Sequence, residues 1–248
     1  MRVVVVGASS GLGRCIAVHL GQKGDRVALL ARRKDRLEAA AKEAGPGAVP
    51  IACDVRSTDS CRTAIDEVVG ALGGIDALVF ATGVGTLGRI EELDVDTWRQ
   101  TLDTNVIGAS LITTAALPHL KVTSGVAAYL SSVQAGHGPV WPGLSSYAVS
   151  KAALDRLVDA WRAEHPSVGF TRVTVGECGG GEGDAQSGFT TGWDADLAGE
   201  LAPGWITKGL MSGLLMDVQD LLRVLDAVLP LGANASIPSV TVMPRHQT

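Results

Sequence analysis

Short runs of β-branched and other apolar residues alternate along the chain with longer segments of helical period. The short runs are typical of buried parallel strands, and apolar residues spaced three and four apart are typical of amphipathic helices. The predicted strands cover residues 3–6, 26–31, 48–53, 75–81, 126–130, 169–175 and 236–242. The predicted helices cover residues 12–23, 34–44, 58–72, 96–117, 145–164 and 217–229. This order predicts an α/β fold in which residues 1–248 form a single Rossmann-type domain with a doubly wound, parallel, seven-stranded sheet.

Residues 176–203 break this alternation, because they are rich in Gly, Asp and Thr and show no clear period. An irregular segment of that length in a compact domain is usually either functional or disordered. It follows the carboxyl end of a predicted strand, where open α/β sheets bind their ligands. We therefore expect residues 176–205 to form a lid over the substrate, with plain disorder as the alternative.

The composition supports a large buried core, since 46% of the 248 residues are hydrophobic and 19% are charged. A formal net charge of −5 argues against a nucleic-acid partner. The four cysteines lack metal-ligand spacing, so we expect buried reduced thiols and no metal site. The early first strand leaves no room for a secretory signal, and no apolar run approaches the ~18 residues of a membrane span. We expect a cytoplasmic protein with no membrane partner.

A glycine-rich segment, Gly7-Ala8-Ser9-Ser10-Gly11-Leu12-Gly13, lies between the first predicted strand and the first predicted helix. Glycines there allow a tight turn and bring backbone amides close to the pyrophosphate of a dinucleotide at the helix N-terminus. A lone glycine triplet is weak evidence, but the flanking strand and helix at the start of a β/α series make it much stronger. The alternative is a glycine turn that binds no ligand.

The residues after the second predicted strand bear on the choice of nicotinamide cofactor. NAD-binding Rossmann enzymes place Asp or Glu there to bind the ribose 2′-hydroxyl, whereas this chain has Ala31-Arg32-Arg33 and no acid until Asp35. A carboxylate repels a 2′-phosphate, and a guanidinium binds it through charge-assisted hydrogen bonds. Arg32 and Arg33 therefore predict NADP, with NAD as the alternative. The alternative is that this basic cluster is simply the solvent-exposed start of a helix and binds no ligand.

Tyr147 and Lys151 are four residues apart at the start of a predicted helix, so they share one face with ~6 Å of rise between them. A tyrosine acts as an acid or base near neutral pH when its phenolate is stabilised, as a neighbouring ammonium does. Ser132 ends the fifth predicted strand, where its hydroxyl can polarise a substrate oxygen, and Ser131 is an alternative. Asn105 is unfavourable within a helix, which indicates a local irregularity and a bound water in a proton path to Lys151.

Together these features resemble the short-chain dehydrogenase/reductase family. The G-x-x-x-G-x-G spacing of the loop is that of the family, and Asn105, Ser132, Tyr147 and Lys151 follow the chain order of its catalytic tetrad. The resemblance covers residues 3–175. It implies that the diphosphate is held by the loop, with contacts from Ser9, Ser10 and Leu12, and that Lys151 holds the ribose hydroxyls. It also implies that the adenine and the rest of the cofactor are lined by Asp54, Val55, Ala81, Thr82 and Gly83.

The chain departs from the family at three places. Phe80-Ala81-Thr82-Gly83 stands where the family has Asn-Asn-Ala-Gly, and Val175-Gly176-Glu177-Cys178 replaces a Pro-Gly motif. The separation between Ser132 and Tyr147 is two residues longer than usual, and the extra length is expected to line the substrate pocket. Candidates for the pocket wall in that loop and in the lid are Gln134, His137, Val140, Trp141, Phe189, Trp193 and Trp205.

The aromatic side chains in this set could cover an apolar or ring-shaped carbonyl compound, or the tryptophans could simply anchor the lid to the core. The sequence predicts an NADP(H)-dependent oxidoreductase that transfers a hydride between nicotinamide and a carbonyl or secondary alcohol. One alternative is a catalytically silent dinucleotide-binding sensor or scaffold of the same fold, and another is an epimerase or dehydratase that uses the cofactor transiently. The resemblance implies a homodimer or homotetramer, built partly from the helices that start near Asp96 and Ser145.

Overall fold

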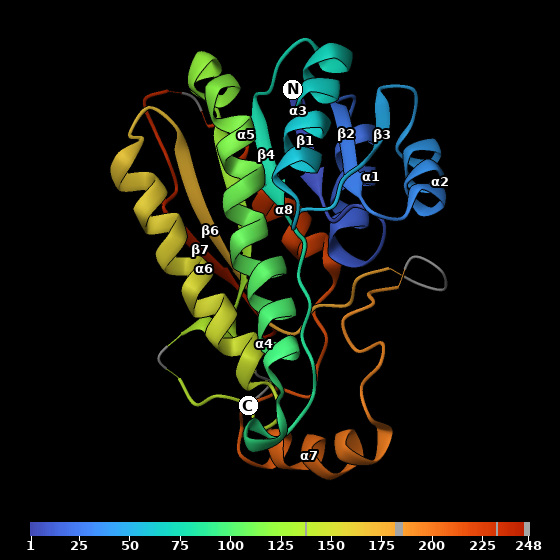
Figure 1. Ribbon diagram of the computed structural model, residues 1–248, viewed down its shortest axis with the longest axis vertical. Helices are drawn as coiled ribbons and strands as arrows, with labels where there is room; N and C mark the ends of the chain where they lie inside the picture. Colours follow the sequence, from blue (N-terminus) through green and yellow to red (C-terminus); the bar gives the residue numbers. More distant parts are fainter. Residues whose placement is uncertain (137, 182–185, 232, 246–248) are drawn as a thin grey trace.

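The fold is built on one parallel sheet of seven strands in the order β3-β2-β1-β4-β5-β6-β7 (Figure 1). The computed structural model describes residues 1–136, 138–181, 186–231 and 233–245. Each pair of neighbouring strands is parallel. The strands are β1 (Arg2–Val6), β2 (Arg26–Ala31), β3 (Ala48–Ala52), β4 (Ala77–Phe80), β5 (Val126–Ser132), β6 (Gly169–Val175) and β7 (Ser239–Val242). The predicted single-domain, doubly wound Rossmann-type fold is confirmed.

Helices cover both faces of the sheet (Figure 1). One face is covered by α3 (Thr58–Leu72), α5 (Gly108–Thr123) and α6 (Ser145–Glu164), and the other by α1 (Gly11–Gln22), α2 (Lys34–Ala44) and α8 (Val218–Val228). Successive residues of a strand point to opposite faces, so Val4 and Val6 of β1 enter one core and Val3 and Val5 the other. This double burial explains why the first strand is apolar throughout.

A helix, α7 (Ala195–Thr207), lies within the segment predicted to be irregular. The prediction of a loop over 176–203 is therefore wrong for its second part. Asp194 caps the helix by accepting from Leu197 N at 2.8 Å. The apolar side chains of Leu197, Leu201 and Trp205 are four residues apart and pack into a small core of their own. Glycines and Pro203 inside the helix conceal this period in the sequence.

The predicted helix at 96–117 is longer than expected and is interrupted. It begins with α4 (Val95–Leu102), passes through a π-helical turn (Asp103–Ile107) and continues as α5. The stretch Val95–Thr123 is long and apolar enough to cross a membrane by length and composition alone, contrary to the expectation that no segment is. Core helices pass the same test, and this one contributes residues such as Ile112 and Leu120 to the main hydrophobic core.

All four cysteines are free thiols, as expected, but only Cys53 and Cys61 are buried. Cys15 and Cys178 are partly exposed, so the expectation of four buried thiols is wrong for this pair. Cys15 lies on α1, and Cys178 lies just after β6.

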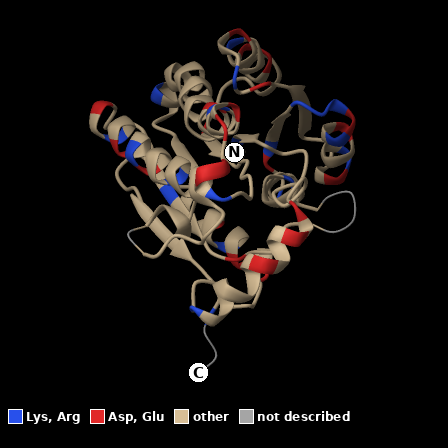
Figure 2. Cartoon of the chain, turned by 60° about the horizontal axis from the view of Figure 1, so that its bottom comes forward, with Lys and Arg blue, Asp and Glu red and all other residues tan. Residues whose placement is uncertain are grey.

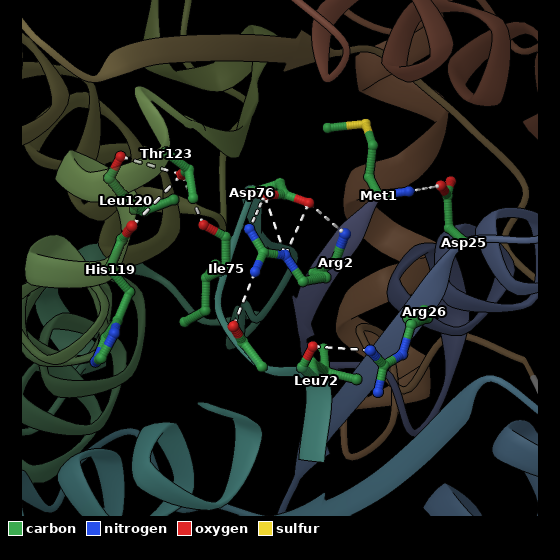
Figure 3. A network of polar contacts seen from close by, with 11 residues as sticks. Met1, Arg2, Asp25, Arg26, Leu72, Ile75, Asp76, His119, Leu120 and Thr123 are labelled. Atoms are coloured by element: carbon green, nitrogen blue, oxygen red, sulfur yellow. Dashed lines mark hydrogen bonds and ion pairs between the residues drawn. The ribbon is translucent and has the colours of Figure 1, made fainter. Parts of the chain in front are cut away.

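Polar contacts tie together the amino ends of the central strands (Figure 3). The Arg2 guanidinium is paired with the Asp76 carboxylate through Nε and Nη2, and its Nη1 donates to Gly73 O at 2.8 Å. Arg26 donates to Leu72 O at 2.9 Å. These bonds link β1 and β2 to the turn between α3 and β4. β4 starts at Ala77, later than the predicted 75, although the Asp76 backbone already donates to Arg2 O at 2.9 Å.

The Asp76 ion pair leads to a prediction about stability. The pairing with Arg2 lowers the pKa of Asp76. A carboxyl with a lowered folded-state pKa stabilises the fold above its unfolded pKa of about 3.9, and that contribution is lost as pH falls through the folded value. Since both side chains are roughly 30% exposed, we expect Asp76→Asn to lower the free energy of unfolding by only about 1–2 kcal/mol near neutral pH.

The loss should shrink as the pH falls from about 4 towards the lowered folded-state pKa of Asp76, because the carboxyl becomes protonated first in the unfolded chain and then in the folded one. Urea denaturation across this range measures it. Asp59→Asn is the matched control, because Asp59 is 83% exposed and pairs only with the exposed Arg62 on its own helix. A loss for Asp76→Asn that is no larger than that of the control would contradict the prediction.

Candidate active site

The glycine loop makes a close turn between β1 and α1. Gly7 has a φ of +92°, and its N–H donates to Leu30 O at 2.7 Å. A Cβ on Gly7 would lie 2.8 Å from Thr82 N, and one on Gly13 would lie 2.3 Å from Gly7 O. No larger side chain fits at either position, so the glycines let α1 begin directly against the strand ends. Ser10 precedes the helix, but its hydroxyl does not cap it.

Positive charge gathers beside this loop at the end of β2. The Arg33 guanidinium donates to the hydroxyls of Ser9 at 2.9 Å and Ser10 at 2.8 Å. Burial lowers the pKa of Arg33, and the like charges of Arg36 and Arg32 lower it further. Figure 2, which brings the bottom of Figure 1 forward, shows basic residues following one another at the start of α2. One guanidinium thus lies at the loop, and the like charges of its two neighbours favour an anion near it.

The residues expected near an adenine lie after β3. Asp54 forms an ion pair with Arg56 at 2.8 Å, and this contact lowers the pKa of Asp54. Val55 is buried against the start of α5, where a Cβ on Gly108 would lie 2.7 Å from Val55 Cγ2. Both residues follow the carboxyl end of β3, which pairs with β2 in the sheet.

The segment after β4 runs between the glycine loop and α6. Ala81 N donates to Val6 O at 2.9 Å, which extends the β1–β4 ladder by one residue. Thr82 lies against Gly7, and a Cβ on Gly83 would lie 3.5 Å from Lys151 Nζ. The three residues Ala81, Thr82 and Gly83 therefore connect the loop with the lysine, and their place along a cofactor stays a prediction.

Tyr147 and Lys151 occupy the first turns of α6. Lys151 is buried, its Nζ donates to Leu130 O at 2.7 Å, and the same atom lies 5.7 Å from the centroid of the Tyr147 ring. Burial lowers the pKa of Lys151 to about 8. Burial also raises the pKa of Tyr147 to about 12, against a smaller opposing effect of the hydrogen bond with Ser132. In this structure burial and Ser132, rather than the ammonium, set the acidity of the phenol.

The two neighbouring serines of β5 point to opposite sides. Ser132 is buried, its hydroxyl accepts from Gln134 N at 3.2 Å, and it lowers the pKa of Tyr147. Ser131 lies on the other side, where it lowers the pKa of Asp155 on α6. The alternation of side chains along a strand thus places Ser132, and not Ser131, beside the phenol.

Asn105 lies within the π-helical turn, so the predicted local helix irregularity is confirmed. Its side chain is fully buried, with Oδ1 accepting from Val84 N at 2.9 Å. Nδ2 donates to Val84 O at 2.8 Å and to Ser150 Oγ at 2.9 Å. Single π-helical turns are frequent at functional sites. Asn105 therefore joins the segment after β4 to α6, one residue before Lys151, while the expected water near it stays a prediction.

Aromatic rings form a continuous row that starts at Tyr147. The Phe189 ring packs edge-on against Tyr147 with centroids 4.8 Å apart, and Trp193 follows 5.4 Å from Phe189. Trp205 lies 6.3 Å from Trp193, and Trp141 lies 5.4 Å from Trp205. The rings come from the lid segment, α7 and the longer loop before α6. The sequence named four of them as pocket candidates, but their direct contact with Tyr147 through Phe189 was not predicted.

Backbone contacts fix the polar ends of these side chains. Trp193 Nε1 donates to Gly85 O at 2.9 Å, and Trp205 Nε1 donates to Pro142 O at 3.0 Å. Gln134 accepts from Trp141 N at 3.0 Å through its side-chain oxygen. These bonds favour the interpretation that the tryptophans anchor the lid. His137 lies outside the described residues, and Val140 is exposed at the surface of the loop.

The start of the lid lies across the glycine loop. A Cβ on Gly180 would lie 2.8 Å from Leu12 N, and one on Gly11 would lie 3.1 Å from Ser187 Cα. Ser187 N donates to Gly180 O at 3.0 Å, which closes this part of the chain on itself. The amide of Leu12, one of the expected diphosphate contacts, is therefore covered by the lid in this structure.

Two residues of the site were missed by sequence reasoning. A Cβ on Gly85 would lie 2.5 Å from the Phe189 ring and 3.2 Å from Tyr147 Cδ2, so only glycine lets the rings meet there. The signal in the sequence that could have found Gly85 is the second glycine, two residues after Gly83, in the segment that follows β4. Asp155 was also missed, although its position four residues after Lys151 marks it as sharing the same helix face.

Comparison with known proteins decides the family. Residues 1–190 match the family model described as short chain dehydrogenase. The chain belongs to the short-chain dehydrogenase/reductase family. It is 33% identical over 183 residues to 11-beta-hydroxysteroid dehydrogenase A of Sesamum indicum, and 36% identical to 11-beta-hydroxysteroid dehydrogenase 1A of Arabidopsis thaliana. Each match covers 70% of this chain and 51% of the relative, so this short-chain dehydrogenase/reductase spans about half the length of these relatives.

Solved structures agree on the fold. An alcohol dehydrogenase from Thermococcus sibiricus, complexed with 5-hydroxy-NADP, superposes with a TM-score of 0.81 at 24% identity, covering 99% of this chain and 97% of that one. A dehydrogenase/reductase from Sinorhizobium meliloti 1021 gives a TM-score of 0.79 at 29% identity, covering 97% and 92%. The short-chain dehydrogenase/reductase fold thus extends over nearly the whole chain, including the part beyond residue 190.

Proposed function

We propose that this chain is an NADP(H)-dependent oxidoreductase that interconverts a carbonyl compound and a secondary alcohol. The observation that carries the proposal is the position of Tyr147, whose ring centroid lies 5.7 Å from the Nζ of the buried Lys151 and whose pKa is lowered by Ser132. This group lies at the carboxyl ends of the strands, where α/β sheets of this kind bind ligands. The glycine loop after β1 opens at the same edge.

The proposal also assigns the residues that would hold the cofactor. The backbone of Gly7, Gly11 and Gly13 and the residues Ser9, Ser10 and Leu12 would hold the diphosphate at the start of α1. Asp54 and Val55 would lie beside the adenine, and Ala81, Thr82 and Gly83 would follow the cofactor towards Lys151, which would hold the ribose hydroxyls. A bound nicotinamide supplies or accepts the hydride of the reaction.

NADP is favoured over NAD by the arginines at the end of β2. Arg33 already donates to the loop serines, and the charges of Arg32 and Arg36 lower its pKa. A 2′-phosphate would relieve this crowding and accept charge-assisted hydrogen bonds. The first carboxylate after β2, that of Asp35, belongs to the first turn of α2 and is exposed.

The proton chemistry belongs to Tyr147. With a pKa of about 12 the phenol carries its proton near neutral pH, so it can donate to a carbonyl oxygen during reduction. Ser132 would share a hydrogen bond with that oxygen and fix its position. A charged Lys151 would stabilise the phenolate that proton transfer leaves behind. Asn105 hydrogen-bonds to Val84 and to Ser150, and so it would hold the segment after β4 in place against α6, next to Lys151.

Residues 176–205 would act as the substrate lid. The part near Gly180 and Ser187 would have to move from the loop before a diphosphate could lie there. The tryptophans would keep the rest attached, and Gln134, Trp141 and Trp193 would line the substrate pocket. A row of rings that reaches Tyr147 through Phe189 suits an apolar or ring-shaped carbonyl compound.

Assembly and location belong to the same proposal. A homodimer or homotetramer would use α4, the π-helical turn, α5 and α6, where Ile107 of the turn and Val149 of α6 are exposed apolar residues. We place the protein in the cytoplasm, as the sequence predicts, with small molecules as its partners and no nucleic acid or membrane.

A panel of apolar and cyclic ketones with NADPH tests the function. We expect loss of the reduced-nicotinamide absorbance with at least some of them, and a much slower loss with NADH. The Tyr147→Phe variant under the same conditions controls for background oxidation. A protein that binds NADPH but oxidises it with none of the ketones would be a dinucleotide-binding sensor or scaffold instead.

A further inference from the structure

The Phe189 ring fills a small space beside Tyr147. The centroids of the two rings lie 4.8 Å apart with their planes at 65°, an edge-to-face arrangement. The Trp193 ring packs against Phe189 in the same manner, at 5.4 Å and 66°. A Cβ on Gly85 would lie 2.5 Å from Cε2 and 2.7 Å from Cζ of Phe189, so the tip of the ring occupies space that only glycine leaves open. We call the space bounded by Gly85, Tyr147 and Trp193 the ring slot.

The walls of the ring slot are held in place by contacts that do not include Phe189. Trp193 Nε1 donates to Gly85 O at 2.9 Å. Tyr147 belongs to α6, and a Cβ on Gly85 would lie 3.2 Å from Tyr147 Cδ2. Trp193 also packs against Trp205 of α7, with ring centroids 6.3 Å apart. We therefore expect the slot to keep its shape when the Phe189 ring leaves it.

Phe189 itself is presented by a turn whose hydrogen bonds are local. Phe189 N donates to Ser187 Oγ at 3.2 Å, and Thr191 N donates to Gly188 O at 3.1 Å. The Phe189 side chain is partly exposed, although its tip lies in the slot. A movement of this turn can therefore withdraw the ring while Trp193 stays in place.

The contacts in the ring slot are those that an aromatic ring makes best. Edge-to-face pairs depend on the quadrupoles of both rings, so they stabilise an aromatic ring beyond the burial of its area. A saturated ring lacks this quadrupole and is thicker, so it gains less from the same walls and approaches Gly85 less closely. The ring in the slot lies against the ring of Tyr147 itself, so a carbonyl joined directly to such a ring would lie close to the Tyr147 hydroxyl.

We propose that the ring slot binds the aromatic ring of an aryl ketone, and that Phe189 occupies the slot in the ligand-free protein until this substrate displaces it. The inference rests on the proposed function, because it assigns the substrate class of the same site. It also gives Phe189 a role other than that of a pocket wall. The Phe189 ring competes with the substrate ring, so only the fraction of molecules with an open slot binds substrate.

The direct test observes Phe189 by NMR in the full-length protein without cofactor. The chain has three phenylalanines, so ¹³C labelling of their rings gives few signals, and Phe189→Leu identifies the one of interest. We expect acetophenone to move the Phe189 signals towards those of a solvated phenylalanine. Cyclohexyl methyl ketone, whose ring is saturated, should need a concentration about 10-fold higher for the same shift. Phe189 signals that acetophenone leaves in place overturn the inference, as does an equal response to both ketones.

The affinity for acetophenone separates a competing ring from a wall of the pocket. The indole N–H of Trp193 reports binding, since the chain has five tryptophans and Trp193→Phe identifies its signal. Phe189→Ala should bind acetophenone about 10-fold more tightly than wild type, because no ring has to leave the slot first. Equal or weaker binding by this variant overturns the inference. The control Ile206→Ala removes an exposed apolar side chain of α7 and should leave the affinity unchanged.

Gly85→Ala adds a readout from the reaction itself. The new methyl group would fill the ring slot, so kcat/KM for acetophenone should fall about 10-fold relative to kcat/KM for butanone, which has no ring. A general defect would lower both values together and leave their ratio unchanged, and that result overturns the inference. Gly70→Ala adds a methyl group in open space on α3 and should keep the wild-type ratio.

The inference and the proposed function can fail separately. A wild type that reduces no ketone with NADPH would refute the proposed function, while displacement of Phe189 by acetophenone would still support the ring slot. An active wild type whose Phe189 signals stay in place with acetophenone would refute the inference alone.

Discussion

Tyr147→Phe is expected to lower kcat for ketone reduction by about 10³-fold, within the range of general acid catalysis, while the affinity for NADPH stays nearly unchanged. The phenol is the proton donor in this account, and the variant removes only its hydroxyl. Such a loss corresponds to about 4 kcal/mol in the activation barrier. Steady-state kinetics measures kcat, and titration of the nicotinamide fluorescence measures cofactor affinity.

The chain supplies a matched control for this variant. It has two tyrosines, and the second, Tyr129, is fully buried in β5 with its hydroxyl 2.7 Å from Thr113 Oγ1. Tyr129→Phe removes the same hydroxyl away from the site, so it should lower stability but keep kcat. If Tyr147→Phe retained wild-type kcat, another side chain would have to supply the proton.

Arg33→Asp is expected to weaken NADPH binding by about 100-fold and NADH binding far less. The guanidinium lies at the loop, where it would form charge-assisted hydrogen bonds with the 2′-phosphate, and the new carboxylate would repel that group. A 100-fold change corresponds to about 2.7 kcal/mol. Fluorescence titration with both cofactors measures the preference. Arg32→Asp, at the preceding position, should have a smaller effect because Arg33 is the arginine that donates to the hydroxyls of Ser9 and Ser10.

Two controls separate charge from folding in this experiment. Arg62→Asp makes the same change of charge on the exposed face of α3 and should alter neither affinity. Arg33→Gln keeps a donor for the hydroxyls of Ser9 and Ser10 while removing the charge, so it should lose NADPH affinity selectively. An equal loss for both cofactors would mean that Arg33 only supports the loop, and NADP preference would need another source.

Much of the fold could be predicted because its signals are local. The all-apolar run of β1 is buried on both faces, and helix α6 runs from Ser145 to Glu164 as its period predicts. Helix α7 could not be predicted, because its stability comes from the packing of Trp205 against Trp141 and Leu87 rather than from helix propensity.

The site divides in the same way. Spacing alone placed Tyr147 and Lys151 on one face, and the unusual position of Asn105 indicated the helix irregularity that the π-helical turn confirms. Spacing could not decide which arginine reaches the loop or which serine faces the phenol. Those outcomes depend on the direction of each side chain at a strand end. The contact between Phe189 and Tyr147 joins segments that are distant in sequence, so no local pattern indicates it.

The central claim is that the Tyr147 phenol faces a nicotinamide whose diphosphate lies on the turn between β1 and α1. A crystal structure of the chain with NADP⁺ tests it most directly. We expect the diphosphate at the amides of residues 7–13, the nicotinamide beside Tyr147 and Lys151, and the lid near Ser187 moved from the loop. A dinucleotide bound elsewhere, or a Tyr147 hydroxyl turned away from the nicotinamide, would contradict the account.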